Sequence, residues 1–154
     1  MQDVALIASH IKDAFADADI ELPPLTLRGG DAMDVYDSPP PFDANTDQAT
    51  DSYIEHYANG LTHLDTVAWL YYLPRFLALA LDKVAEPSHI VIEALLWNLR
   101  PPDRDPPRLG ALTSKQEEVV LEVLEFLAFE PESMNQDFAM QVMEEYWIED
   151  NLYR

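Results

Sequence analysis

Histidine is the first residue type to consider for catalysis or metal binding in this chain of 154 residues, which has four histidines and no cysteine. His56 and His63 are seven residues apart and would share one face of a continuous helix. Gly60 lies between them and favours a helix end, which would separate the two imidazoles. Asp51 and Glu55 could supply carboxylates near His56, but the two-histidine pattern of zinc proteases is absent. We therefore expect no metal and no cofactor, and an enzyme or metal-binding protein using His56 or His63 is kept only as an alternative.

Carboxylates are numerous, because 29 residues are Asp or Glu. An acid–base pair of the glycosidase type needs one carboxyl group in an apolar environment. Glu93, in an apolar run, comes nearest to this, but we expect it to face solvent or to pair with Arg100. No serine lies in a nucleophile-elbow motif, and Gly29-Gly30 lacks the context of a phosphate-binding loop. The sequence therefore predicts a protein that is not an enzyme.

The net charge of −20 is the dominant feature of the composition. Such a charge repels nucleic acids and anionic membranes and attracts basic proteins. It belongs to the two flanks of the chain, since residues 1–60 carry −10, residues 113–154 carry −9, and residues 61–112 carry only −1. If the terminal helices pack side by side, their outer faces would form one extended acidic surface. A purely solubilising role of the charge is the alternative.

Aromatic residues within these acidic flanks are the expected anchors for a partner, because Tyr and Trp are enriched at interface hot spots. Tyr36 lies among aspartates in the N-terminal flank. Tyr146 and Trp147 are adjacent, so we expect only one of them to face the core. The predicted partner-binding residues are Asp31, Asp34, Tyr36, Asp37, Asp43, Glu144, Glu145, Trp147, Glu149 and Asp150.

The spacing of apolar residues predicts the elements that must position these side chains. About six helices are expected, over residues 4–18, 48–59, 67–81, 89–99, 114–127 and 133–152. Asp65 or Thr66 is the predicted cap of the third, Ser88 that of the fourth, and Thr113 with Gln116 forms a capping box for the fifth. Pro74 should kink the third helix or split it.

Proline and glycine mark the irregular parts of the chain. Residues 22–46 are predicted to form a long irregular segment, and residues 100–108 a stiff surface connection. No stretch alternates as a half-buried strand requires, so the predicted fold is a single all-α domain with a Pro-kinked central helix. The longest apolar run is too short to span a bilayer, and no signal-like segment opens the chain, so we expect a cytoplasmic protein.

The run Leu64-Asp65-Thr66-Val67-Ala68-Trp69-Leu70-Tyr71-Tyr72-Leu73-Pro74-Arg75-Phe76-Leu77 resembles the signature of an uncharacterised bacterial family of small helical domains. The resemblance continues through Leu99-Arg100-Pro101-Pro102 and the helix start at Leu112-Thr113, and covers about residues 60–130, with Ala14-Phe15 in addition. It implies that the Tyr-Tyr-Leu-Pro helix is an element of the fold. It implies no activity, and the acidic C-terminal helix lies outside it.

The function we predict is that of a non-catalytic acidic binding protein. The leading hypothesis is an immunity or antitoxin-type inhibitor that occludes the active site of a basic bacterial toxin, such as a secretion-system nuclease effector. A nucleic-acid mimic acting on DNA-binding proteins is the alternative among binding proteins. The expected partner is thus a basic protein, with neither nucleic acid nor membrane as a ligand.

Overall fold

The computed structural model describes residues 3–18 and 22–154, and these residues contain helices and turns but no strand. The α-helices are α1 (Val4–Ala14), α2 (Leu27–Asp34), α3 (Asp51–His56), α4 (Thr66–Asp82), α5 (Ile90–Asn98), α6 (Ser114–Phe129) and α7 (Gln136–Val142). Two 3-10 turns, η1 (Ala58–His63) and η2 (Leu109–Ala111), and one π-helical turn, η3 (Met143–Trp147), complete them. The prediction of an all-α domain is confirmed.

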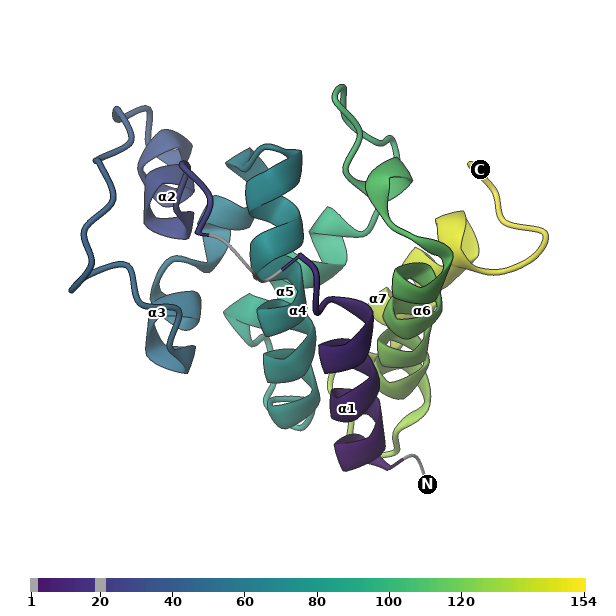
Figure 1. Ribbon diagram of the computed structural model, residues 1–154. Helices are drawn as coiled ribbons and strands as arrows, with labels where there is room; N and C mark the ends of the chain where they lie inside the picture. Colours follow the sequence, from purple (N-terminus) through teal and green to yellow (C-terminus); the bar gives the residue numbers. More distant parts are fainter. Residues whose placement is uncertain (1–2, 19–21) are drawn as a thin grey trace.

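Helix α4 lies at the centre and contacts α1, α3, α5 and α6 (Figure 1). Helices α2 and α3 lie at one end of the molecule, and α6, α7 and the C-terminus lie at the other (Figure 1). The largest fully buried side chains come mainly from α4, with Trp69, Tyr72 and Phe76 inaccessible to solvent. The run that carries the Tyr-Tyr-Leu-Pro motif is therefore the core of the fold.

The start of α4 follows the prediction, because the Asp65 carboxylate accepts a hydrogen bond of 2.9 Å from the Ala68 N–H. Pro74 lies inside the helix and is buried, but α4 runs through it without being split in two. The missing N–H costs one backbone hydrogen bond. Since eleven of the seventeen residues of α4 are buried, packing on every side outweighs that loss.

The capping box of α6 is confirmed. The Thr113 hydroxyl accepts from the Gln116 N–H at 3.1 Å, and the Gln116 side chain accepts from the Thr113 N–H at 2.9 Å. Gln116 also donates to the carbonyl of Ala14 at 3.2 Å, which ties the start of α6 to the end of α1. Helix α1 ends there, four residues before the predicted end at residue 18.

The irregular segment predicted for residues 22–46 is wrong in part, because it contains α2. Its start is capped by the Thr26 hydroxyl, which accepts from the Gly29 N–H at 2.9 Å. Gly29 and Gly30 are poor helix formers, and the prediction treated them as loop residues. Both are buried in α2, and the backbone of Gly30 packs directly on that of Gly60 in η1.

Two other boundaries differ from the prediction. The helix expected over residues 48–59 is only the short α3, and η1 continues through Gly60, where the helix was expected to end. The cap of α5 is His89, whose Nδ1 accepts from the Val91 N–H at 3.2 Å, and not Ser88.

The helix predicted over residues 133–152 is also shorter, since α7 passes into the π-turn η3 and ends at Trp147. The Ile148 N–H donates to the carbonyl of Met143, five residues earlier, at 3.2 Å. A π-turn holds one residue more than an α-turn. This turn therefore directs three successive side chains inward, and Glu145, Tyr146 and Trp147 are all buried.

Candidate functional site

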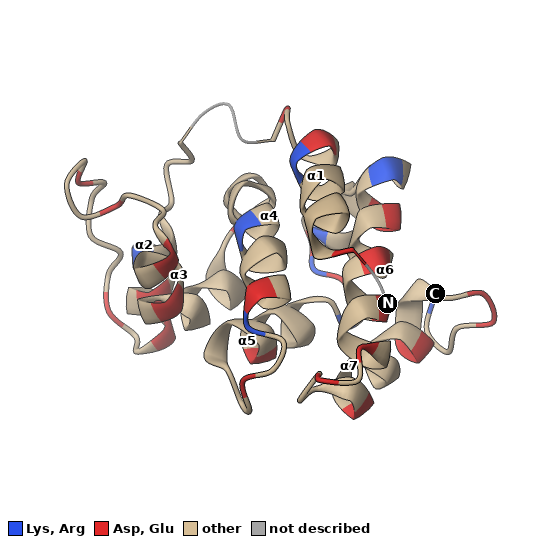
Figure 2. Ribbon diagram, turned by 90° about the horizontal axis from the view of Figure 1, so that it is seen from below, with Lys and Arg blue, Asp and Glu red and all other residues tan. Residues whose placement is uncertain are grey.

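The ten predicted partner-binding residues lie in two groups at opposite ends of the molecule. Those between residues 31 and 43 belong to α2 and the loop after it, whereas those between residues 144 and 150 belong to η3 and the C-terminal segment (Figure 1). Figure 2 shows acidic residues at both ends. Helices α1 and α6 do pack together, but the expected single acidic surface does not join these two groups.

At the first end, α2 and the loop after it present an acidic surface, formed by Asp31, Asp34, Tyr36, Asp37 and Asp43, which we call the α2 surface. Asp34 and Asp37 are exposed, and Asp31 is half-buried. Burial raises the pKa of Asp31, and the nearby charge of Asp34 raises it further. Ionisation of Asp31 is therefore disfavoured chiefly by burial and only secondarily by the charge of Asp34, while His56 acts in the opposite direction.

The loop after α2 is fixed by a buried ion pair. Arg28 donates from Nε and Nη2 to the two oxygens of Asp47, at 3.0 and 2.8 Å. The Tyr53 hydroxyl donates to the same carboxylate at 2.7 Å, and the Asp43 N–H does so at 2.8 Å. Arg28 together with these donors holds the pKa of Asp47 at about 2.

The Asp43 carboxylate serves the loop, because its Oδ1 accepts from the N–H groups of Asn45 and Thr46, both at 2.9 Å. These bonds lower the pKa of Asp43, the one from Thr46 contributing most. Asp34 also has a local partner, since its Oδ1 lies 2.8 Å from Nε2 of His63. Asp37 and Tyr36 are thus the exposed residues of the α2 surface whose side chains form no such hydrogen bond or ion pair within the described residues.

Tyr36 is the most exposed large hydrophobic side chain of the described residues, at 98%. Its backbone is left-handed, with φ of 63°. Val35 and Phe42 are exposed on the same segment, so the α2 surface combines apolar and acidic groups. Tyr36 is thus exposed among aspartates, and its role as an anchor for a partner stays a prediction.

At the second end, Glu144, Glu149 and Asp150 are exposed, but Glu145 and Trp147 are buried, with 6% exposed each. Arg100 donates from Nε to Oε2 of Glu145 at 3.1 Å, and the Trp147 indole N–H donates to the Leu99 carbonyl at 2.9 Å. Glu145 and Trp147, predicted to contact a partner, thus lie in the core and form hydrogen bonds within the fold. The prediction that only one of Tyr146 and Trp147 faces the core is wrong, and the π-turn is the reason.

His56 and His63 contact different residues, although the helical structure does not end at Gly60 as predicted. His56 is exposed and stacks edge-on against Tyr57, whereas His63 pairs with Asp34. In residues 3–18 and 22–154 no group of three or more His, Asp or Glu side chains could hold a metal ion. Glu93 is exposed, as predicted, but Arg100 pairs with Glu145 instead.

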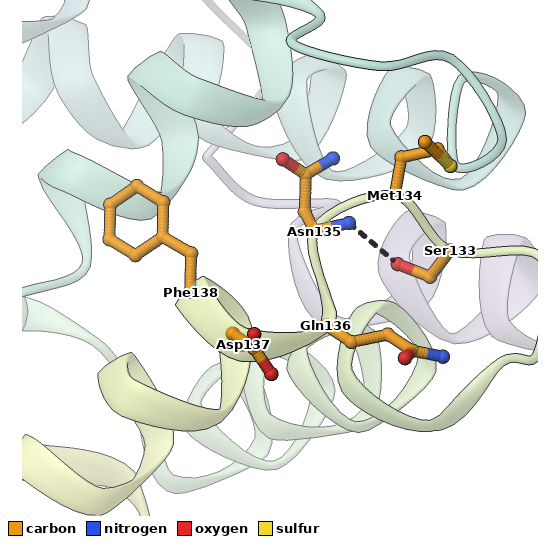
Figure 3. Close-up of a pocket in the computed structure, with 6 residues that line it drawn as sticks. All are labelled: Ser133, Met134, Asn135, Gln136, Asp137 and Phe138. Atoms are coloured by element: carbon orange, nitrogen blue, oxygen red, sulfur yellow. Dashed lines mark hydrogen bonds between the residues drawn. The ribbon is translucent and has the colours of Figure 1, made fainter.

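A hollow of about 420 Å³ is formed by the connection from α6 to α7 and the first turn of α7 (Figure 3). The residues that line it are consecutive, from Ser133 to Phe138. The Asn135 N–H donates to the Ser133 hydroxyl at 3.2 Å, and that hydroxyl is itself committed to the Leu127 carbonyl. The hollow therefore offers no activated nucleophile.

A second groove, of about 540 Å³, was not predicted. We call it the arginine groove, and it is lined chiefly by Thr62, Trp97, Asn98, Arg100, Arg104 and Arg108, with two prolines. It holds three of the six arginines of the chain. The only sequence signal was the recurrence of arginine at every fourth residue from 100 to 108, which the prediction treated as a surface connection.

None of the helices in the described part of the chain has the length and hydropathy needed to cross a bilayer. Comparison with curated proteins and with solved structures gives no match. Comparison with family models matches residues 3–151 to a family of unknown function, DUF6714. The match covers both acidic flanks as well as residues 60–130. Since it covers nearly the whole sequence, the chain belongs to this family of unknown function, DUF6714.

Proposed function

We propose that this protein is a non-catalytic binding protein that holds a basic protein partner on its α2 surface, with Tyr36 as the central contact. The observation that carries this proposal is the combination at Tyr36 of full exposure and a left-handed backbone. A side chain kept in a costly conformation without contacts in its own fold points to a use outside that fold.

The cost can be located in the C-terminal cap of α2. The Tyr36 N–H donates to the Met33 carbonyl at 3.1 Å, and the Asp37 N–H donates to the Ala32 carbonyl at 2.9 Å. These two bonds form a Schellman motif, in which the left-handed position is usually glycine because it has no Cβ. Tyr36 occupies that position, where glycine would make the fold more stable.

The surroundings of Tyr36 suit a basic partner. Asp34 and Asp37 flank it in sequence and are exposed, while Val35 and Phe42 add apolar area. Many protein interfaces have an aromatic residue at the centre and charges of one sign around it. The central aromatic supplies most of the affinity, and the surrounding charges increase the association rate. The net charge of −20 extends the attraction beyond contact distance.

The partner that best fits this surface is a basic bacterial toxin, such as a nuclease effector, and the protein would act as its cytoplasmic immunity or antitoxin protein. A nuclease cleft binds phosphates with Lys and Arg. The aspartates of the α2 surface would occupy that cleft, and Tyr36 would fill the space where a base stacks. Inhibition would then follow from occlusion, with no chemical step.

The test begins with capture on immobilised protein from an extract of the native host. Three forms are compared: wild type, Tyr36→Gly, and Glu149→Gln, which removes an exposed charge at the opposite end. We expect wild type and Glu149→Gln to retain the same basic protein at low salt and to release it at high salt. The retained protein is then purified, and its affinity for each form is measured by calorimetry.

For Tyr36→Gly we expect the affinity for that purified protein to fall by more than tenfold, as for an interface hot spot. If no basic protein is retained, or if Tyr36→Gly binds it as tightly as wild type does, the proposal fails. Competition by DNA for a partner that is not a nuclease would favour the nucleic-acid mimic instead.

A further inference from the structure

We propose that the arginine groove is a binding site for a small oxyanion, a phosphate or carboxylate group, and that it shares no residue with the α2 surface. The groove is an exception in a strongly acidic chain, because the residues that line it include Arg100, Arg104 and Arg108 but no carboxylate. The proposal rests on how each guanidinium is, or is not, neutralised.

Arg108 is the central observation. Only 7% of Arg108 is exposed to solvent, yet no carboxylate among the described residues forms an ion pair with it. Its Nη1 donates to the carbonyls of Leu61 and Thr62, at 3.3 and 3.1 Å, and its Nε is buried with no acceptor. Burying a cation without an anionic partner is costly, so the groove is organised to receive a counter-charge.

Two carboxylates lie close to Arg108 in sequence. Asp105 is exposed and forms no ion pair with it, and the oxygens of Asp103 already accept hydrogen bonds from the loop. Oδ1 of Asp103 accepts from the N–H groups of Arg104, Arg108 and Leu109, and its Oδ2 accepts from the Gly110 N–H, all at 2.8 to 2.9 Å. Asp103 attracts Arg108 only at longer range. Burial, followed by the charge of Arg104, lowers the pKa of Arg108 to about 10, so the guanidinium remains charged at neutral pH.

The other two arginines complete the site. Arg100 is held by Glu145, with Nη2 at 2.9 Å from Oε1, and its guanidinium lies over the Trp97 ring at 4.6 Å. Arg104 is exposed and forms no ion pair with a carboxylate in the part of the chain that the structure describes. One charge in the groove is therefore compensated, and those of Arg104 and Arg108 are not.

The remaining polar groups of the groove select for an acceptor. The Asn98 amide donates to Thr62 Oγ1 and to the Ala94 carbonyl, and its oxygen accepts from the Trp69 indole, so its groups are already committed. The guanidinium of Arg104 and the remaining N–H groups of Arg108 are left as donors, and guanidinium geometry matches the paired oxygens of phosphate and carboxylate. The net charge of the protein would repel a polyanion, which favours a small ligand over nucleic acid.

The experiment measures the thermal midpoint and the calorimetric affinity of the full chain with inorganic phosphate, pyrophosphate and citrate, at constant ionic strength. A ligand that binds only the folded state raises the midpoint in a saturable way. The variants are Arg104→Gln, which alters an exposed side chain, and Arg108→Lys, which keeps the charge but removes the fork. Lys115→Gln is the control, since it removes one exposed positive charge outside the groove.

We expect saturable binding of at least one of these anions by wild type and Lys115→Gln, and a loss of tenfold or more in affinity in Arg104→Gln and Arg108→Lys. Preference for pyrophosphate identifies phosphate chemistry, and preference for citrate identifies carboxylate chemistry. The proposal is overturned if no anion binds saturably at millimolar concentrations, or if Arg104→Gln binds as wild type does. Circular dichroism of each variant checks that the helices are intact.

Discussion

The backbone of Gly30 in α2 lies directly against that of Gly60 in η1. A Cβ added at Gly30 would lie 3.0 Å from the carbonyl carbon of Gly60 and closer still to its oxygen, and one added at Gly60 would lie 2.6 Å from the Asp31 nitrogen. Neither glycine has a positive φ, so the requirement is for space and not for an unusual backbone conformation. This contact joins the α2 surface to the core.

Alanine at Gly30 should therefore destabilise the fold, because backbone atoms cannot move aside as a flexible side chain can. We expect Gly30→Ala to lower the free energy of unfolding by about 2 kcal/mol or more. Gly29→Ala is the matched control in the same helix, since the nearest atom to its Cβ is the end of the Leu25 side chain at 3.0 Å. Urea denaturation of the two variants measures the difference, and equal midpoints would contradict the packing described.

The same contact explains why α2 could not be predicted from sequence. Two adjacent glycines are unfavourable in a helix by roughly 1 kcal/mol each, and the close backbone contact that favours glycine at position 30 is with Gly60, thirty residues away. Two caps that depend on neighbouring residues, the Asp65 cap and the Thr113–Gln116 box, were predicted correctly, whereas the predicted Ser88 cap is replaced by His89. A hydrogen bond between neighbouring residues can be predicted from a short stretch of sequence, whereas close packing between distant residues cannot.

The candidate sites also contain some residues that could be placed from local sequence and others that could not. Tyr36 could be placed in the α2 surface because its segment is short of apolar residues that would bury it. Glu145 and Trp147 could not be placed, because one extra residue in the π-turn rotates everything after Val142 relative to an α-helix. Arg108 was missed because its burial depends on the carbonyls of Leu61 and Thr62, far away in sequence.

The strain at Tyr36 can be measured apart from any partner. Tyr36→Gly relieves the left-handed position, whereas Tyr36→Ala removes the same side chain and keeps the Cβ. We expect the glycine variant to be more stable than the alanine variant by about 1 kcal/mol in urea denaturation. An alanine variant as stable as the glycine variant would show that the Schellman position stores no strain, and the proposed function would lose its main support.

The Arg28–Asp47 pair should make stability depend on pH in the acid range. The pKa of Asp47 is about 2 in the folded protein, below the ordinary 3.8, so the pair stabilises the fold above pH 3.8. That contribution, about 2 kcal/mol by linkage, is lost as the pH falls from about 4 to about 2. Urea midpoints of wild type and Asp47→Asn should differ at pH 7 and converge towards pH 2.

Asp17→Asn, which alters an exposed carboxylate of the same flank, is the control for that comparison and should follow wild type at every pH. A pH profile of Asp47→Asn parallel to that of wild type would show that another group carries the acid dependence.

Glu145 and Glu144 are neighbours with opposite environments, and this difference separates a structural from a surface role at the C-terminal end. Glu145 is buried and pairs with Arg100, whereas Glu144 is exposed. Glu145→Ala leaves Arg100 half-buried without its counter-charge, so we expect a loss of about 3 kcal/mol in the free energy of unfolding. Glu144→Ala should change it by less than about 0.5 kcal/mol. Urea denaturation of both variants decides between the π-turn and a regular α-helix, because a regular helix would reverse the order or remove the difference.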